Sequence, residues 1–382
     1  TCLRAEWYKE SLINDEGNPI PLDYNFDRWE QIKVPGCWNM HNDRYYYYGG
    51  PAVYTRKFQF RRGRFFGDTE RVFLKLNGVQ YEAKIFLNKT YIGLHRGGST
   101  PFCIEITKQL LDENRIFVVV DNTRRSDQVP ALNTDWFNYG GIHRSIDIFR
   151  TPELFIKDFF MYLVPDGTFS KIQAEIVIDK SDTPCTASIK IPELAVERNI
   201  DILNGKGSTL FEVRPELWSP ESPKLYDVIV SCEKDEVRDK IGFREIKVHG
   251  TQIFLNGKEM FFRGICCHEE SPIGGKSRTE EEILSDLQAA KDLGCNYVRL
   301  AHYPHSERVS QLADRLGILL WEEIPVYWVL EFENPETYRD AENQLLELIK
   351  RDHNRASVVI WSIGNENADT DSRFEFMRSL AA

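Results

Sequence analysis

Two residues at the end of an apolar run carry groups suited to acid and base chemistry. Asn365 and Glu366 follow the stretch SVVIWSI at 357–363. A carboxyl group at the end of an apolar strand loses solvation, which raises its pKa toward a value useful for proton donation at neutral pH. The amide beside it is suited to hold a hydroxyl group. We therefore predict a proton-transfer role for Glu366 and a binding role for Asn365.

Polar side chains also follow three other predicted strands, at 259–265, 296–300 and 318–323. In a (β/α)8 barrel the carboxyl ends of all strands meet on one face, and that face carries the chemistry. Four strands that end in this way indicate one shared site. The polar residues that follow the three strands, in chain order, are His268, Glu269 and Glu270, then Arg299, His302, Tyr303 and His305, then Glu322, Glu323, Tyr327 and Trp328.

Each of these residues also has a plainer interpretation. Arg299 is as well suited to a structural ion pair as to a ligand contact. One of Glu322 and Glu323 must face away from the barrel centre, because neighbours on a strand point to opposite sides. A lone histidine in a loop, such as His305, is more often solvated than functional.

No metal or cofactor site is predicted. His302 and His305 have the spacing of a metal pair, but no third ligand follows at a suitable distance along the chain. The 8 cysteines form no CxxC pair, and we interpret them as mostly buried free thiols.

The elements that would position these residues alternate between strand and helix in residues 249–382. Thr279 and Glu282 predict a capping box at the start of a helix that Gly294 ends. Further helices are predicted at 307–317 and from 335 to about 353, and the strands between them are almost continuously apolar. Parallel βα units buried on both faces have this pattern. We therefore expect an α/β TIM barrel, of which four strands, about the first half, are present.

The first 248 residues have the pattern of two all-β domains. Short alternating strands broken by Gly, Asn and Asp predict a jelly-roll sandwich for residues 1–150. A second set of strands over residues 151–248 fits an immunoglobulin-like sandwich.

Composition excludes some partners. A formal net charge of −11 argues against nucleic acid, because phosphate binding relies on an excess of Lys and Arg. No apolar run reaches the length of a membrane span, so no membrane partner is expected. The chain starts at Thr1 rather than Met, which is compatible with removal of a leader, and a cytoplasmic, periplasmic or secreted location stays open for a soluble protein.

Several motifs resemble those of a known family. RDHNRASVVIWSIGNEN at 351–367 resembles the signature of glycoside hydrolase family 2, the group of β-galactosidases, β-glucuronidases and β-mannosidases. NYVRLAHYPHSERVSQLADRLGILLWEE at 296–323 is similar to its second signature. VPGCWN, YYGGPAVYTRKF and DWFNYGGIHRSIDIF are similar to its sugar-binding domain, and LWSPESPKLYDV to the end of its immunoglobulin-like domain. The third of these sugar-binding motifs is closest to the β-glucuronidase branch.

The resemblance implies an exo-acting, retaining β-glycosidase and a β-linked glycoside or oligosaccharide as its partner. Such enzymes use two carboxyl groups about 5–5.5 Å apart, an acid/base and a nucleophile. Glu366 falls on the acid/base position and Asn365 on the amide that bonds the sugar 2-hydroxyl. His302 and Asp135 match groups that contact the terminal sugar. Arg299, Glu323 and Trp328 are further substrate-binding candidates at the strand ends.

One part of the family pattern has no counterpart in this sequence. The family's nucleophile is a Glu well downstream of the acid/base, but only 16 residues follow Glu366. Asp371 and Glu375 fall in the next predicted helix. We therefore expect a truncated copy of a larger enzyme, inactive as these 382 residues alone. A non-catalytic carbohydrate-binding protein with an incomplete barrel is the alternative. The choice between glucuronide and galactoside, and a homo-oligomeric state, stay open.

Overall fold

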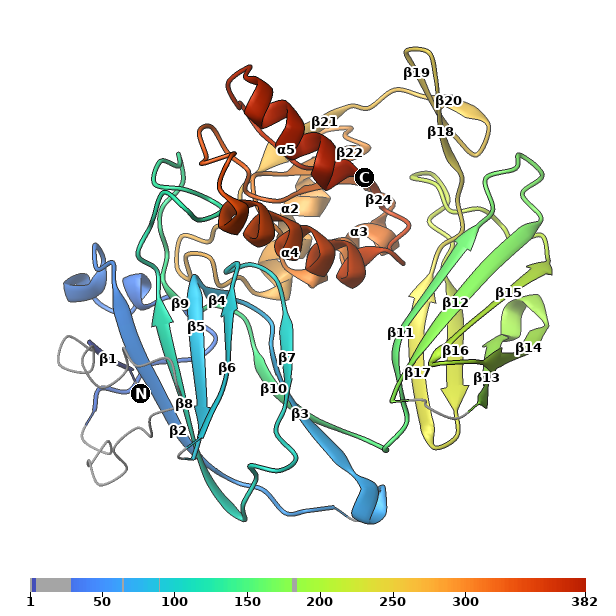
Figure 1. Ribbon diagram of the computed structural model, residues 1–382. Coiled ribbons are helices and arrows are strands. Elements are labelled where there is room, and N and C mark those ends of the chain that lie inside the picture. The colour runs from blue at the N-terminus through green and yellow to red at the C-terminus, as the bar shows by residue number, and fades with distance from the viewer. Residues whose placement is uncertain (1, 5–28, 64, 89, 181–183) are drawn as a thin grey trace.

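The computed structural model describes residues 2–4, 29–63, 65–88, 90–180 and 184–382. Figure 1 shows a sandwich in blue and cyan at the left and a second in green and yellow at the right. A mixed α/β part in orange and red lies above them. The three parts follow one another in the sequence.

The first sandwich is the predicted jelly roll. A five-stranded sheet with the order β1-β2-β8-β5-β6 faces a three-stranded sheet with the order β10-β3-β7, and β4 pairs with β9. Alternate side chains of both sheets point inward, and Leu76, Ile85 and Val120 in the core are fully buried. The strands are β1 (Cys2–Arg4), β2 (Pro51–Gln59), β3 (Arg71–Leu76), β4 (Val79–Gln80), β5 (Glu82–Leu87), β6 (Thr90–Arg96), β7 (Phe102–Glu105), β8 (Glu113–Asp121), β9 (Gly141–Ile142) and β10 (Ile146–Thr151).

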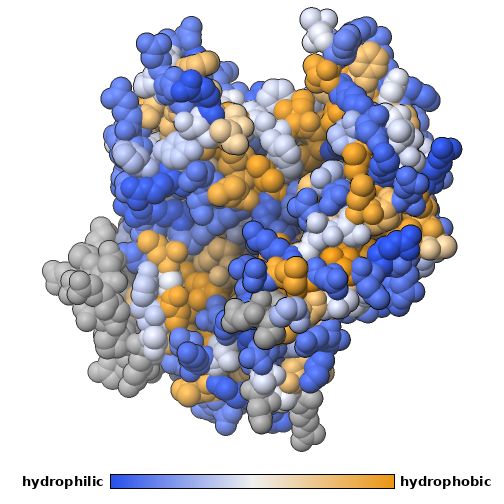
Figure 2. Space-filling model, turned by 45° about the vertical axis from the view of Figure 1, so that its right-hand side comes forward, coloured by the Kyte–Doolittle hydropathy of each residue, from blue (hydrophilic) through white to orange (hydrophobic). Residues whose placement is uncertain are grey.

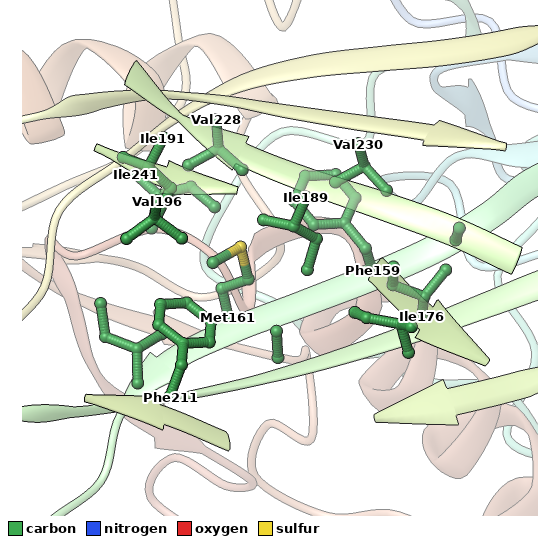
Figure 3. Packing of buried hydrophobic residues seen from close by; sticks show 14 of the residues in the cluster. Phe159, Met161, Ile176, Ile189, Ile191, Val196, Phe211, Val228, Val230 and Ile241 are labelled. Carbon is green, nitrogen blue, oxygen red and sulfur yellow. The ribbon is translucent and has the colours of Figure 1, made fainter. Parts of the chain in front are cut away.

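The second sandwich is the predicted immunoglobulin-like domain. Its sheets have the orders β11-β12-β15 and β14-β13-β16-β17. Figure 3 shows how Met161, Ile189 and Val230 from the two sheets meet in its core. The strands are β11 (Phe155–Leu163), β12 (Lys171–Asp179), β13 (Cys185–Ile191), β14 (Val196–Ile202), β15 (Lys206–Glu212), β16 (Tyr226–Cys232) and β17 (Asp235–Ile241).

A small antiparallel sheet separates this sandwich from the α/β part and corrects one prediction. It contains β18 (Ile246–His249), β19 (Gln252–Leu255) and β20 (Lys258–Met260). The apolar run 259–265 was expected to be one strand, but its start belongs to β20 and its end to β21 (Gly264–Cys267). Asn256 and Gly257 both have positive φ, 54° and 76°, and form the hairpin turn that pairs β19 with β20. An Asn-Gly pair predicts such a turn from sequence.

The α/β part contains four parallel strands in the order β21-β22-β23-β24, as predicted. The Thr279–Glu282 capping box is present, and Gly317 ends α3 with a left-handed φ of 70°. Helices α2 and α3 pack on the sheet around Ile283, Leu312 and Val298. The other elements are β22 (Tyr297–Leu300), β23 (Leu319–Glu323), β24 (Val358–Ser362), α2 (Glu280–Asp292), α3 (Glu307–Leu316), α4 (Pro335–Asp352) and α5 (Asp371–Ala381).

Burial differs among these strands, which corrects a second prediction. Nearly all of β23 is buried, but three of the four residues of β21 are exposed. The reason is that β21 lies at one edge of the sheet. For a related reason the cysteines are free but not mostly buried: among those whose side chains are described, only Cys37 and Cys232 are buried, whereas Cys266 is exposed on β21.

The α/β part is attached to both sandwiches by specific contacts. Tyr81 of the jelly roll donates a hydrogen bond to Asp340 of α4. Asn354 donates to the Phe159 carbonyl in the second sandwich at 2.9 Å, and Trp218 donates to the Asp314 carbonyl at 2.8 Å.

On the face shown in Figure 2, hydrophobic residues are interspersed with hydrophilic ones. Within the described part of the chain, every helix is too short or too polar to cross a bilayer.

Candidate active site

Glu366 lies beyond the carboxyl end of β24, in a segment that is bonded to the segment after β23. The Trp328 N–H donates to the Asn365 carbonyl at 3.0 Å, and the Asn365 N–H donates to the Val326 carbonyl at 2.9 Å. These bonds make a parallel bridge between Tyr327 and Asn365. The Trp328 indole then donates to Glu366 Oε2 at 2.7 Å. The position of the Glu366 carboxyl is therefore set by two strand ends rather than one.

The expected loss of solvation at Glu366 is not found, because this residue is exposed. The reason is its distance from the apolar run. Strand β24 ends at Ser362, so the carboxyl projects past the end of the sheet. Hydrogen bonding by Trp328, rather than burial, is what holds this side chain.

Arg299 and Glu323 form the buried centre of the site. Arg299 Nε and Nη2 each donate to a Glu323 carboxylate oxygen at 3.0 Å. His302 Nδ1 lies 2.6 Å from Glu323 Oε1, and Arg299 Nη2 also donates to Asn365 Oδ1 at 2.5 Å. Glu323 is 1% exposed. Arg299 thus forms a structural ion pair with Glu323 and also orients Asn365, a candidate binding residue. Its position is compatible with both interpretations, the structural ion pair and the ligand contact.

The Arg299 bond defines which way the Asn365 amide faces. Arginine only donates, so the atom that it bonds must be the amide oxygen. Asn365 Nδ2 is therefore on the other side, where it is buried and has no hydrogen-bond partner among the described residues. A buried donor without a partner costs free energy unless a ligand or water accepts its hydrogen. This amide nitrogen lies one residue from Glu366.

Asp135 comes from the jelly roll, in the segment between β8 and β9, and is brought to the barrel strands by Trp136. The Trp136 ring centroid lies 5.0 Å from that of Tyr327, 5.3 Å from that of Tyr303 and 5.8 Å from that of His302. The Tyr327 hydroxyl lies beside the carboxylates of both Asp135 and Glu366, and its single hydrogen can be donated to only one of them at a time. Burial, followed by these two carboxylates, raises the pKa of Tyr327. A phenol from the third strand end therefore connects the two domains.

Three strand-end residues point away from this site. Glu322 lies by Asp352, and burial followed by that neighbour raises the pKa of Glu322 well above its usual value. Glu269 accepts hydrogen bonds from Arg144 at 2.8 Å and from the Ser306 N–H at 2.6 Å. His305 was interpreted as solvated, but it is buried, and its ring bonds the Ala301 carbonyl at 2.9 Å. That interpretation failed because the segment after β22 is packed between other elements: Arg144 of the jelly roll donates to the Pro304 carbonyl at 2.9 Å, and Arg351 of α4 donates to the His305 carbonyl at 2.8 Å.

The structure also gathers three possible metal ligands. One ligand atom each from Asp135, His268 and His302 lies within 4.8 Å of the other two. Spacing along the chain did not indicate a metal site, because Asp135 lies more than a hundred residues from the two histidines.

Sequence reasoning left three residues of the site without a role: Trp136, His268 and Tyr327. Two of them follow strands, and Trp136 is adjacent to Asp135 in the sequence. Those positions are the signals that could have identified them. Among the predicted residues, Asn365, His302, Arg299 and Glu323 are in one network, and Trp328 and Asp135 join it through Glu366 and Tyr327.

Comparison with known families covers nearly the whole chain. Residues 246–381 match the family description "Glycosyl hydrolases family 2, TIM barrel domain". Residues 6–152 match "Glycosyl hydrolases family 2, sugar binding domain", and residues 154–244 match "Glycosyl hydrolases family 2".

Individual proteins show the same similarity. The chain is 28% identical over 417 residues to a β-glucuronidase of Paenibacillus borealis, covering 98% of this chain and 67% of that protein. It is 30% identical over 395 residues to a β-galactosidase of Thermoanaerobacterium thermosulfurigenes, covering 97% of this chain and 52% of that protein. The crystal structure of an Eisenbergiella tayi β-galacturonidase bound to galacturonate superposes with a TM-score of 0.83 at 28% identity, covering 95% of this chain and 66% of that one. The chain thus spans about half to two thirds of the length of these relatives.

Proposed function

Because the chain belongs to glycosyl hydrolases family 2, we propose that this protein is a retaining exo-β-glycosidase. It would remove terminal β-linked sugars, of the glucuronide or galactoside type. The observation that carries the proposal is the buried Asn365 Nδ2, which has no hydrogen-bond partner among the residues that the structure describes, next to the Glu366 carboxyl. A donor for a sugar hydroxyl and a proton-transfer group stand side by side at the end of one strand.

The proposed reaction has two steps. In the first, Glu366 gives its proton to the glycosidic oxygen, the bond from that oxygen to the anomeric carbon breaks, and the aglycone leaves as an alcohol. A second carboxylate attacks the same carbon and forms a covalent glycosyl ester. In the second, Glu366 takes a proton from water, which displaces the sugar from that ester. We assign the second carboxylate to a Glu outside these 382 residues, as the motif resemblance implies.

The remaining residues of the site would hold the sugar. Asn365 Nδ2 would donate to the 2-hydroxyl, a bond that strengthens as the oxocarbenium-like transition state forms. His302 and Asp135 would contact other hydroxyls of the terminal sugar, with Trp136 and Trp328 beside them. Glu323 and Arg299 act indirectly, because they orient His302 and Asn365 rather than reach the mouth of the site.

The test uses the full-length protein, a panel of aryl β-glucuronides, β-galactosides and β-galacturonides, and matched 2-deoxy glycosides. We expect one class to be hydrolysed with retention, so that NMR detects the β-anomer first. Replacing Asn365 by Ala should then lower kcat/KM about 10²-fold on the hydroxylated substrate. It should change little on the 2-deoxy substrate, which lacks the partner of Nδ2.

Three outcomes would contradict the proposal. The α-anomer as first product would exclude the retaining mechanism. An equal loss on hydroxylated and 2-deoxy substrates would show that Asn365 acts by maintaining the structure rather than by binding the 2-hydroxyl. Sugar binding without any turnover would instead favour a carbohydrate-binding protein.

A further inference from the structure

Asp135, His268 and His302 have an arrangement that suits a cation as well as a sugar. They come from the segment before β9, the end of β21 and the end of β22, and one ligand atom of each lies within 4.8 Å of the others. We propose that these three side chains bind Zn²⁺ with a fourth position open to the mouth of the site. Metal binding is independent of the proposed function, and only the inhibition described below rests on it.

His302 is oriented as metal-binding histidines usually are. Such histidines bond a carboxylate or carbonyl through the ring nitrogen that does not face the metal. His302 Nδ1 lies 2.6 Å from Glu323 Oε1, which leaves Nε2 for a ligand. Glu323 is itself held by two bonds from Arg299 at 3.0 Å. The supporting partners of this histidine are thus in place.

The other two groups are supported in a similar way. The Tyr303 hydroxyl lies 3.5 Å from His268 Nδ1, on the side away from a ligand bound at Nε2. The rings of His268 and His302 are 5.3 Å apart and nearly perpendicular, at 76°. The Tyr327 hydroxyl lies beside the Asp135 carboxylate. Each of the three groups therefore has a polar neighbour.

The three donors are a set that zinc uses. Two imidazole nitrogens and one carboxylate oxygen, with a fourth position open, are the ligands of a common kind of catalytic zinc site. Glu323, the carboxylate beside the His302 ring, is paired with Arg299.

The geometry needs only a small adjustment. Zinc binds His nitrogen and carboxylate oxygen at about 2.0–2.2 Å, which in a tetrahedron separates ligand atoms by about 3.4 Å. Asp135 is exposed and can approach the histidines by rotation of its side chain. A bound cation would occupy the lone pairs that the proposed function assigns to sugar hydroxyls. Zn²⁺ should therefore inhibit hydrolysis in competition with the substrate.

Binding is measured on the full-length protein with Co²⁺ by visible absorption and with Zn²⁺ by calorimetry. We expect one site without a thiolate charge-transfer band, because no cysteine is involved. Asp135→Asn and His268→Gln should each weaken binding at least tenfold. Glu323→Gln, which removes the carboxylate beside His302 and the partner of Arg299, should weaken it about tenfold. His249→Gln, an exposed histidine in the β18 hairpin, should leave it unchanged.

Three results would overturn the proposal: no saturable binding, unchanged binding in Asp135→Asn, or an absorption spectrum dominated by thiolate ligands. Because Asp135 is exposed, its variant is expected to fold, and circular dichroism checks this. As a second readout, Zn²⁺ should raise the apparent KM without changing kcat, and a chelator should restore the original KM. Zinc binding with no effect on KM would support the metal site and would argue against the proposed contacts of His302 and Asp135 with the sugar.

Discussion

Trp328 and Glu366 are joined by a hydrogen bond of 2.7 Å, and both residues have a left-handed backbone with φ of 53°. This conformation is uncommon for residues other than glycine and is unfavourable for a bulky side chain such as Trp. Two such residues in contact mean that the surrounding structure imposes their geometry. Backbone strain of this kind is typical of functional sites. The parallel bridge between Tyr327 and Asn365 directly adjoins both positions and holds them in place.

We expect Trp328→Phe to lower kcat about tenfold on substrates with poor leaving groups. Phenylalanine keeps a ring at this position but cannot donate a hydrogen bond to Glu366, and a hydrogen bond to a charged group contributes about 1.5 kcal/mol. Steady-state kinetics of the full-length protein measure the change, with Val329→Ala as the control in the same segment. A rise in KM with kcat unchanged would assign Trp328 to sugar binding instead.

Glu366→Gln should remove general acid catalysis. We expect a loss of about 10²–10⁴-fold on alkyl glycosides and a much smaller loss on activated aryl glycosides, whose leaving groups need little protonation in the first step. Glu375→Gln, on the exposed surface of α5, is the matched control and should have wild-type rates. Equal losses on both classes of substrate would contradict the assignment of Glu366 as the acid.

Glu323→Gln should destabilise the protein and disorder the site together. The substitution leaves the Arg299 guanidinium partly buried without its carboxylate, which costs about 3 kcal/mol of unfolding free energy. It also replaces the charged acceptor beside the His302 ring by a neutral amide with one accepting oxygen. Urea unfolding measures the first effect and KM the second. A free energy of unfolding equal to that of the wild type would mean that the attraction between Arg299 and Glu323 is offset by the cost of removing their charges from water.

The contact between Glu269 and Arg144 predicts a loss of stability in acid. Burial opposes ionisation of Glu269, but Arg144 and other nearby cations outweigh it and lower the pKa of this carboxyl to about 2. A lowered folded-state pKa stabilises the protein above the unfolded value of about 4.5, and this stability is lost as the pH falls toward 2. The shift corresponds to about 3 kcal/mol.

The measurement compares the free energy of unfolding of wild type and Glu269→Gln between pH 7 and pH 2. The difference should be largest at pH 7 and should shrink below pH 4.5. Glu221→Gln, an exposed residue of the second sandwich, serves as the control for general acid effects. A difference that does not change with pH would show that Glu269 matters through packing alone.

Local patterns predicted the elements well and failed where two elements meet. The capping box at Thr279 and the glycine end of α3 were correct, because helix ends depend on residues within one turn. The run 259–265 was divided between two sheets because the Asn256–Gly257 turn, just before it, returns the chain. The alternation meant that only one of Glu322 and Glu323 could face the barrel centre, and Glu323, the candidate named from the sequence, lies beside His302.

The sequence by itself determined the three kinds of domain, the run of polar residues at the strand ends and the prominence of Asn365 and Glu366. The domains follow from apolar residues that repeat every two positions in strands and about every four positions in helices. Asn365 and Glu366 lie in one contiguous motif. Only the tertiary structure decided that Asp135 meets His268 and His302, that Glu366 is exposed and that Asn365 Nδ2 has no partner within the described part of the chain. Those properties depend on how the jelly roll packs on the parallel strands, and contacts between residues so distant in the chain leave no local pattern in the sequence.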